Sequence, residues 1–214
     1  MTDYRFIRPK FDDPYPPGPV KVNGFAYHNA LVLVRFASAV KTRVKEDADY
    51  VVAADYVVAA EYAASWIAAD GTVTRVVVPR GMLTDLTSVP PGLRWFIGRV
   101  GPWLEAAVVH DWLCIAWMTL DGDGSTDRRK FADDVMLAAM KEARVNIVMR
   151  RAIYLAVRAW GWWRYPQQVD PGRKHKLYVD LGDATVQDQL SGGVTLAGLS
   201  PGDFEPEGTE SSFA

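Results

Sequence analysis

The hydrophobic pattern of this 214-residue chain changes once, near residue 100, and that change limits the fold more than any other feature. Before it, residues 30–36 and 72–78 are rich in β-branched and aromatic residues, which is typical of strands. After it, residues 102–119 carry apolar side chains at the three-to-four-residue spacing of an amphipathic helix. Strands followed by helices predict an α+β fold, with N-terminal antiparallel strands and then a three-helix segment.

A tandem repeat lies between the two predicted strands: DYVVAA at residues 49–54 recurs at residues 55–60. Because six is an even number, a strand through this segment would place one set of side chains on one face. That set is Tyr50, Val52, Tyr56, Val58, Tyr62 and Trp66. The alanines leave a helix as the alternative, and we favour the strand. Asp70-Gly71 then predicts a hairpin turn before residues 72–78.

The second half of the chain predicts three helices. Residues 102–119 and 127–143 flank a loop short enough to make the two helices an antiparallel hairpin. A break near Val145-Asn146 precedes a third helix, which we expect Pro166 to end. Its apolar stripe favours packing on the core with its arginines outward. Membrane-surface contact by residues 147–164 is the lesser alternative.

Composition predicts one domain between two tails. Residues 1–22 contain five prolines and are expected to form an extended arm. Residues 23–166 would form a single α+β domain. Residues 167–214 are acidic, lack aliphatic periodicity and are expected to form a largely flexible tail.

Charge and cysteine content exclude several classes of protein. The chain has 24 basic and 26 acidic residues, a net charge of -2, so we expect no nucleic-acid partner. No stretch reaches the roughly 18 apolar residues of a membrane span, so no transmembrane segment is expected. The single cysteine, Cys114, cannot form an intramolecular disulfide. Its apolar neighbours predict a small buried side chain rather than a reactive thiol.

One histidine and one aspartate are predicted to face each other across the helical hairpin. His110 and Asp133 each share a helix face with apolar residues, so both should point inward. A carboxylate that orients an imidazole and stabilises its charged form creates a general base. A buried pair that only fixes the helix register is an equally weighted interpretation of the same two residues.

Asp111 follows His110 and points about 100° further around the helix, toward the loop of residues 81–90. The loop offers four oxygen-bearing side chains: Thr84, Asp85, Thr87 and Ser88. The carboxylates of Asp85 and Asp111, with backbone carbonyls, would suit calcium or magnesium. The alternative is a hydrogen-bonded turn that needs no metal.

Three segments together resemble a known family: VPRGMLTDLTSVP at 78–90, AAVVHDWL at 106–113 and RKFAD at 129–133. They are similar to a small domain of unknown function common in tailed phages and prophages. Its pattern is GF-x-TD-x-x-S-x-P, then A-x-x-HD-x-L-Y, then R-x-x-AD. The resemblance covers about residues 60–165. Met82 and Cys114 depart from it, standing where the family has aromatic residues.

The His-Asp pair on one helix and the aspartate on the next also resemble the arrangement in secreted phospholipase A(2) enzymes. That resemblance implies His110 as the base that activates water and Asp133 as the residue that orients it. It implies Asp111 as a metal ligand, with Asp85 in place of the ligands of the enzymes' calcium loop. Three further residues are expected to support the site: Thr84, Ser88 and Arg129.

These observations lead to three hypotheses of function. The first is a phage- or prophage-encoded hydrolase assisted by calcium or magnesium. The second is a non-catalytic virion or tail-associated protein, whose arm and acidic tail contact other virion proteins. The third is a protein that blunts a host defence by binding. The resemblance places such a protein in the virion or the host cytoplasm. An open space over His110 would favour the first hypothesis, and a filled one the second.

Overall fold

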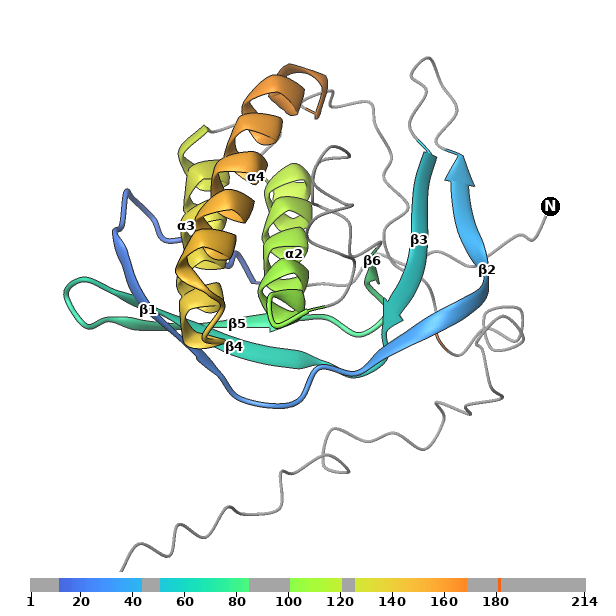
Figure 1. The fold of residues 1–214 in the computed structure, drawn as a ribbon, viewed down its shortest axis with the longest axis horizontal. Coiled ribbons are helices and arrows are strands. Elements are labelled where there is room, and N and C mark those ends of the chain that lie inside the picture. Colours follow the sequence, from blue (N-terminus) through green and yellow to red (C-terminus); the bar gives the residue numbers. More distant parts are fainter. Residues whose placement is uncertain (1–11, 44–50, 85–100, 121–125, 169–180, 182–214) are drawn as a thin grey trace, which may run out of the picture.

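The computed structural model describes residues 12–43, 51–84, 101–120, 126–168 and 181. Strands come first: β1 Val22–Tyr27, β2 Leu33–Arg43, β3 Val51–Val58, β4 Tyr62–Ala68, β5 Val73–Val78 and β6 Leu83–Thr84. Helices follow: α2 Leu104–Leu120, α3 Thr126–Glu142 and α4 Ile147–Gln168. The predicted α+β fold, with antiparallel strands before three helices, is confirmed (Figure 1).

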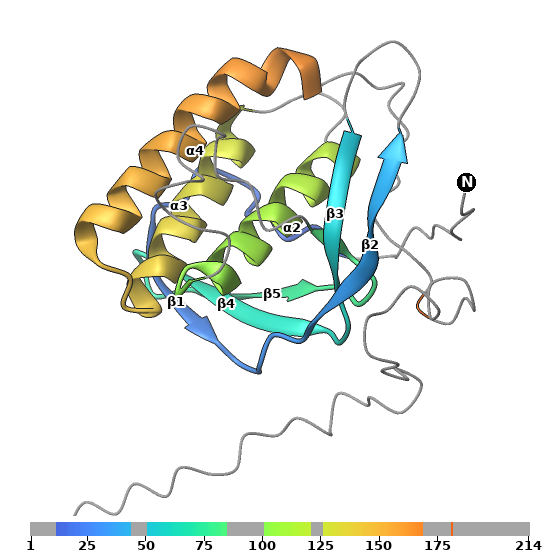
Figure 2. The same ribbon diagram turned by 45° about the vertical axis from the view of Figure 1, so that its right-hand side comes forward.

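The strands form two antiparallel sheets, ordered β1-β4-β5 and β2-β3-β6. Figures 1 and 2 show the helices over one face of the β1-β4-β5 sheet, with the long β2–β3 ribbon rising beside them. The described part of the tandem repeat is extended, as predicted, and both copies contribute to the single strand β3. The chain leaves the β2-β3-β6 sheet after Val58 and enters the β1-β4-β5 sheet at Tyr62. The single face expected for the repeat is therefore divided between two sheets.

The turn between β4 and β5 has the predicted chemistry. Gly71 has a φ of 88°, a left-handed conformation that glycine adopts without steric cost. The Asp70 carboxylate accepts a hydrogen bond of 2.9 Å from the Thr72 backbone N–H. Local sequence alone therefore closes this hairpin.

The break between α3 and α4 lies where the sequence predicts it. Arg144 has a φ of 55°, and the Val145 N–H donates to the Met140 carbonyl at 3.0 Å, which is the hydrogen bonding of a Schellman motif. Asn146 then caps α4 by accepting from the Val148 N–H at 2.9 Å. The expected end of α4 is wrong: the helix passes Pro166 and ends at Gln168. A proline this close to a helix end removes only one of the last backbone hydrogen bonds.

The core lies between the β1-β4-β5 sheet and the helices α2 and α3. Trp66 of β4 packs edge-to-face on Phe131 of α3, with ring centroids 5.0 Å apart. Trp112 and Leu113 of α2 are fully buried. Burial of such side chains contributes about 1.5–3 kcal/mol each, so the two apolar helix faces fix how α2 and α3 lie on the sheet.

Part of the N-terminal arm is packed on the domain. Residues 12–21 contain no helix or strand, as expected. Tyr15 nevertheless enters the core and its hydroxyl donates to the Leu113 carbonyl at 2.5 Å. Asp13 forms an ion pair of 3.1 Å with Arg128 of α3. Residues 1–11 of the arm, and all of the predicted acidic tail except Gln167, Gln168 and Leu181, lie outside the described part of the chain.

None of the described helices combines the length and the apolar character that crossing a bilayer requires.

Candidate functional site

His110 and Asp133 meet in the interior. The Nε2 atom of His110 lies 2.9 Å from Oδ1 of Asp133, so the predicted contact across the α2–α3 hairpin is present. Both side chains are almost inaccessible, with exposed fractions of 5% and 2%. A carboxylate can only accept a hydrogen bond, so the Nε2–H group donates to it. In the neutral ring this arrangement leaves the lone pair on Nδ1.

The neighbours of both residues explain their inward direction. Val109 and Leu113 on α2 are fully buried, and so are Ala132 and Met136 on α3. The hydrophobic faces of the two helices therefore turn the polar pair into the same interior space. The position of the pair follows from helical periodicity, as the sequence predicts.

Asp111 lies on the other side of the imidazole. Its Oδ1 atom is 4.0 Å from Nδ1 of His110, which is too long for a direct hydrogen bond. A water molecule could hydrogen-bond to both atoms at this separation. The Thr84 hydroxyl of β6 donates to Oδ2 of Asp111 at 2.9 Å and so links the loop segment to α2. Thr84 thus contacts Asp111 directly, and its role as a supporting residue of a site stays a prediction.

Cys114 also contacts the imidazole. Its sulfur lies 3.7 Å from Nε2 and 3.9 Å from Nδ1 of His110, one helical turn away. The near-equal distances show that the sulfur is not directed at one nitrogen alone. The side chain is partly exposed. Cys114 packs against the hydrophobic core, so the prediction of a small buried side chain holds in part.

The surroundings of His110 favour its charged form. Burial by itself would lower the pKa of the imidazole. The Cys114 sulfur and the Asp133 carboxylate both favour the charged ring, and together they outweigh the burial. The pKa of His110 therefore lies well above its ordinary value of 6.5.

Helix α4 contributes an arginine to the site. Nη1 of Arg158 lies 3.7 Å from Oδ2 of Asp133 and 3.5 Å from Oδ1 of Asp134. The Tyr154 hydroxyl donates to Oδ1 of Asp134 at 2.7 Å. Arg158 is thus a cation beside the buried carboxylate that orients His110.

The sequence predicts an outward position for every arginine of α4, and for Arg158 that prediction is wrong. Arg150 and Arg158 both border the apolar stripe that contains Ile153 and Val157. Spacing alone therefore gives no signal for which of them reaches α3. The adjacent carboxylates of Asp133 and Asp134 are the sequence feature that indicates a nearby cation.

The remaining predicted residues are less closely connected to His110. Asp85 and Ser88 lie outside the described residues. Arg129 faces α4. Its guanidinium group lies so close to Gly161 that a larger side chain at position 161 would overlap it. Within the ranges that the structure describes, no three His, Cys, Asp or Glu side chains gather in a way that could hold a metal ion. Calcium or magnesium binding by Asp111 and Asp85 stays a prediction.

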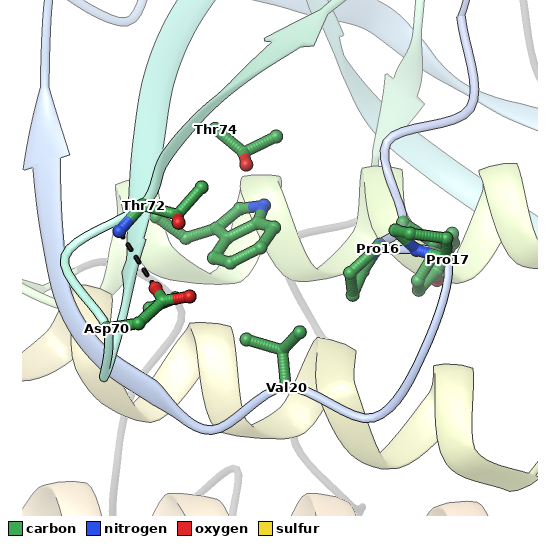
Figure 3. Close-up of a pocket in the computed structure, with 9 residues that line it drawn as sticks. Pro16, Pro17, Val20, Asp70, Thr72 and Thr74 are labelled. Carbon is green, nitrogen blue, oxygen red and sulfur yellow. Dashed lines mark hydrogen bonds between the residues drawn. The ribbon is translucent and has the colours of Figure 1, made fainter.

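A cavity lies between the N-terminal arm and the β4–β5 hairpin (Figure 3). Its volume is about 210 Å³, and it is walled by Pro16, Pro17, Val20 and the hairpin residues Asp70, Thr72 and Thr74. Tyr15, Trp66 and Ala68 complete its lining. The Asp70 carboxylate in it is already bonded to the Thr72 N–H. None of the residues around His110 lines this cavity, so it is separate from the candidate site.

Fold and site together define an α+β protein with a buried His–Asp pair between two antiparallel helices. The family model described as "Protein of unknown function (DUF1353)" matches residues 47–157, just over half of the chain, and the protein belongs to this family. The match includes the tandem repeat, His110, Asp111 and Asp133. No curated protein and no solved structure matches the chain.

Proposed function

We propose that this protein is a hydrolase in which His110 acts as the general base that activates water. The observation that carries the proposal is the hydrogen bond of 2.9 Å from Nε2 of His110 to Asp133. It fixes the ring orientation and directs the second nitrogen toward the partly exposed side of α2, where Asp111 and Cys114 lie. A positioned base with one bonded and one available nitrogen is what proton abstraction from water requires.

The proposed reaction is hydrolysis of an ester. Nδ1 of His110 takes a proton from water as the water oxygen attacks the carbonyl carbon. Asp133 stabilises the imidazolium that forms, through the Nε2–H bond. The tetrahedral intermediate then collapses, the C–O bond to the leaving group breaks, and the imidazolium returns its proton to the leaving oxygen. Since the base is the neutral ring, the rate should rise with pH through the raised pKa of His110.

A hard cation held by Asp111 and Asp85 would polarise the carbonyl group of the substrate. The carboxylate of Asp111 suits this role. The Thr84 hydroxyl donates a hydrogen bond of 2.9 Å to Oδ2 of this carboxylate and so fixes its position. We propose calcium or magnesium as the cation. The phage or prophage setting belongs to the same proposal and is supported by the three motifs that carry the family resemblance.

A second candidate function is non-catalytic. The exposed fraction of His110 is only 5%, and this favours a pair that locks α2 onto α3. The protein would then act through its surface, as a component of a virion or another assembly. The residues around His110 would set the stability of the fold and take no part in a reaction.

Hydrolysis of p-nitrophenyl esters by the full chain separates the two functions. We expect His110→Asn and Asp133→Asn to reduce the rate by about 10²-fold or more, the range for loss of a positioned base. Asp134→Asn is the matched control because it removes the neighbouring carboxylate, which contacts Tyr154 and Arg158 rather than His110. Equal rates for the wild type and His110→Asn would contradict the hydrolase and support the structural role.

A further inference from the structure

Helix α4 presents apolar side chains to solvent. Three of the four exposed large hydrophobic residues in the described part of the chain lie on it: Ile147 (58%), Val148 (74%) and Leu155 (64%). Val148 and Leu155 are seven residues apart, so they lie two turns apart on one side of the helix. The opposite side holds the buried Ile153 and Val157. The helix is therefore apolar on a covered face and on an exposed one.

The charge of this exposed face is positive. Arg151 is exposed and lies between Val148 and Leu155 on the same side of the helix. The sequence of α4 contains four arginines and no acidic residue, although the whole chain has a net charge of -2. Arg144 and Lys141, just before the helix, are also exposed. Arg158 is turned to Asp133 and Asp134, and Glu142 is exposed beside Lys141, so the exposed charge near this face comes from Arg151, Arg144 and Lys141 against one acid and is net positive.

The position of α4 makes this face accessible. The helix packs against α3 and lies at the outer edge of the helices in Figure 2. We propose that the outer face of α4, formed by Ile147, Val148, Arg151 and Leu155, docks on the surface of an anionic lipid bilayer. Arginine would pair with lipid phosphates while the aliphatic side chains enter the headgroup region. A nucleic acid would match the charge but not the apolar side chains.

This inference is independent of the proposed hydrolysis and is tested by binding alone. The full chain is mixed with vesicles of phosphatidylcholine, with or without phosphatidylglycerol, and the bound fraction is measured by flotation. We expect binding to the anionic vesicles, weakened by salt, and little binding to the neutral ones. The double substitution Val148→Ser/Leu155→Ser should weaken binding by about tenfold or more, since two aliphatic side chains no longer enter the bilayer. Arg151→Glu should weaken it as well.

Val73→Ser is the matched control, because Val73 on β5 is 62% exposed and lies outside the proposed surface. It should bind like the wild type. All substituted side chains are at the surface, so the thermal midpoints should agree. The inference is overturned if the wild type does not float with anionic vesicles, or if the double variant binds as well as Val73→Ser. It is also overturned if sedimentation shows a dimer that the double substitution dissociates, since a second copy would then cover this face.

Discussion

His110 links the candidate chemistry to the stability of the fold. Its pKa is raised in the folded protein, so the folded state binds the proton more tightly than the unfolded state does. The resulting stabilisation is complete below the unfolded pKa of about 6.5 and is lost as the pH rises through the folded pKa. The free energy of unfolding should therefore fall with pH above about 6.5. Urea titrations at several pH values measure this slope.

His110→Asn is the control for this pH dependence, since asparagine does not titrate. The slope above pH 6.5 should be smaller in this variant than in the wild type. Identical slopes in the two proteins would mean that His110 is not the group responsible.

Arg158 is the second residue whose effect follows from a contact. Oδ2 of Asp133 is buried without a hydrogen bond among the described residues, and Arg158 is 3.7 Å away. Arg158→Ala should lower the free energy of unfolding by about 1–3 kcal/mol, the range for a buried polar group that loses its partner. The exposed Arg151 on the same helix is the control, and Arg151→Ala should change it by no more than about 0.5 kcal/mol. Similar losses for both variants would show that Arg158 does not support Asp133.

Replacing Asp111 with asparagine tests the proposed cation site. A cation that binds only the folded protein raises its thermal midpoint in proportion to the logarithm of the cation concentration. We expect calcium or magnesium to raise the midpoint of the wild type and not that of Asp111→Asn. If neither cation shifts the wild-type midpoint, Asp111 and Asp85 do not form a metal site.

At the scale of elements, the turn between α3 and α4 contains a strained backbone conformation that a substitution can relieve. Arg144 is exposed and adopts a left-handed conformation, with a φ of 55°. Arg144→Gly should stabilise the protein by about 0.5–1 kcal/mol, since glycine adopts this conformation without steric cost. Arg144→Ala is the matched control and should give no gain, because alanine retains the Cβ. The measurement is urea unfolding, and a glycine variant no more stable than the alanine variant would contradict the account.

Elements that depend on local pattern were predictable from the sequence. The β4–β5 hairpin follows from Asp70-Gly71, and the α2–α3 hairpin follows from two apolar stripes around a short loop. The end of α4 was not predictable, because proline within the last turn of a helix is tolerated there. The assignment of β3 and β4 to different sheets was not predictable either. The two copies of the repeat are identical and both contribute to β3, so nothing in the repeat marks the change of sheet that follows Val58.

At the scale of the whole molecule, the candidate site was predictable only in part. His110 and Asp133 come together because helical periodicity turns both inward, and this information is local to each helix. Arg158 and Tyr15 reach their partners from distant segments. Tyr15 donates to Leu113, 98 residues away, and no periodic pattern encodes such a pairing. Such contacts depend on how whole layers pack, so sequence spacing does not reveal them.

The central claim is that Asp133 holds the His110 imidazole with a proton on Nε2 and a lone pair on Nδ1 in the neutral ring. Nitrogen-15 NMR of the imidazole across pH tests it most directly, because the two nitrogens have separate shifts. We predict a neutral form protonated at Nε2, a pKa above 6.5 in the wild type, and a lower pKa in Asp133→Asn. A neutral ring protonated at Nδ1, or a pKa that Asp133→Asn leaves unchanged, would contradict the account.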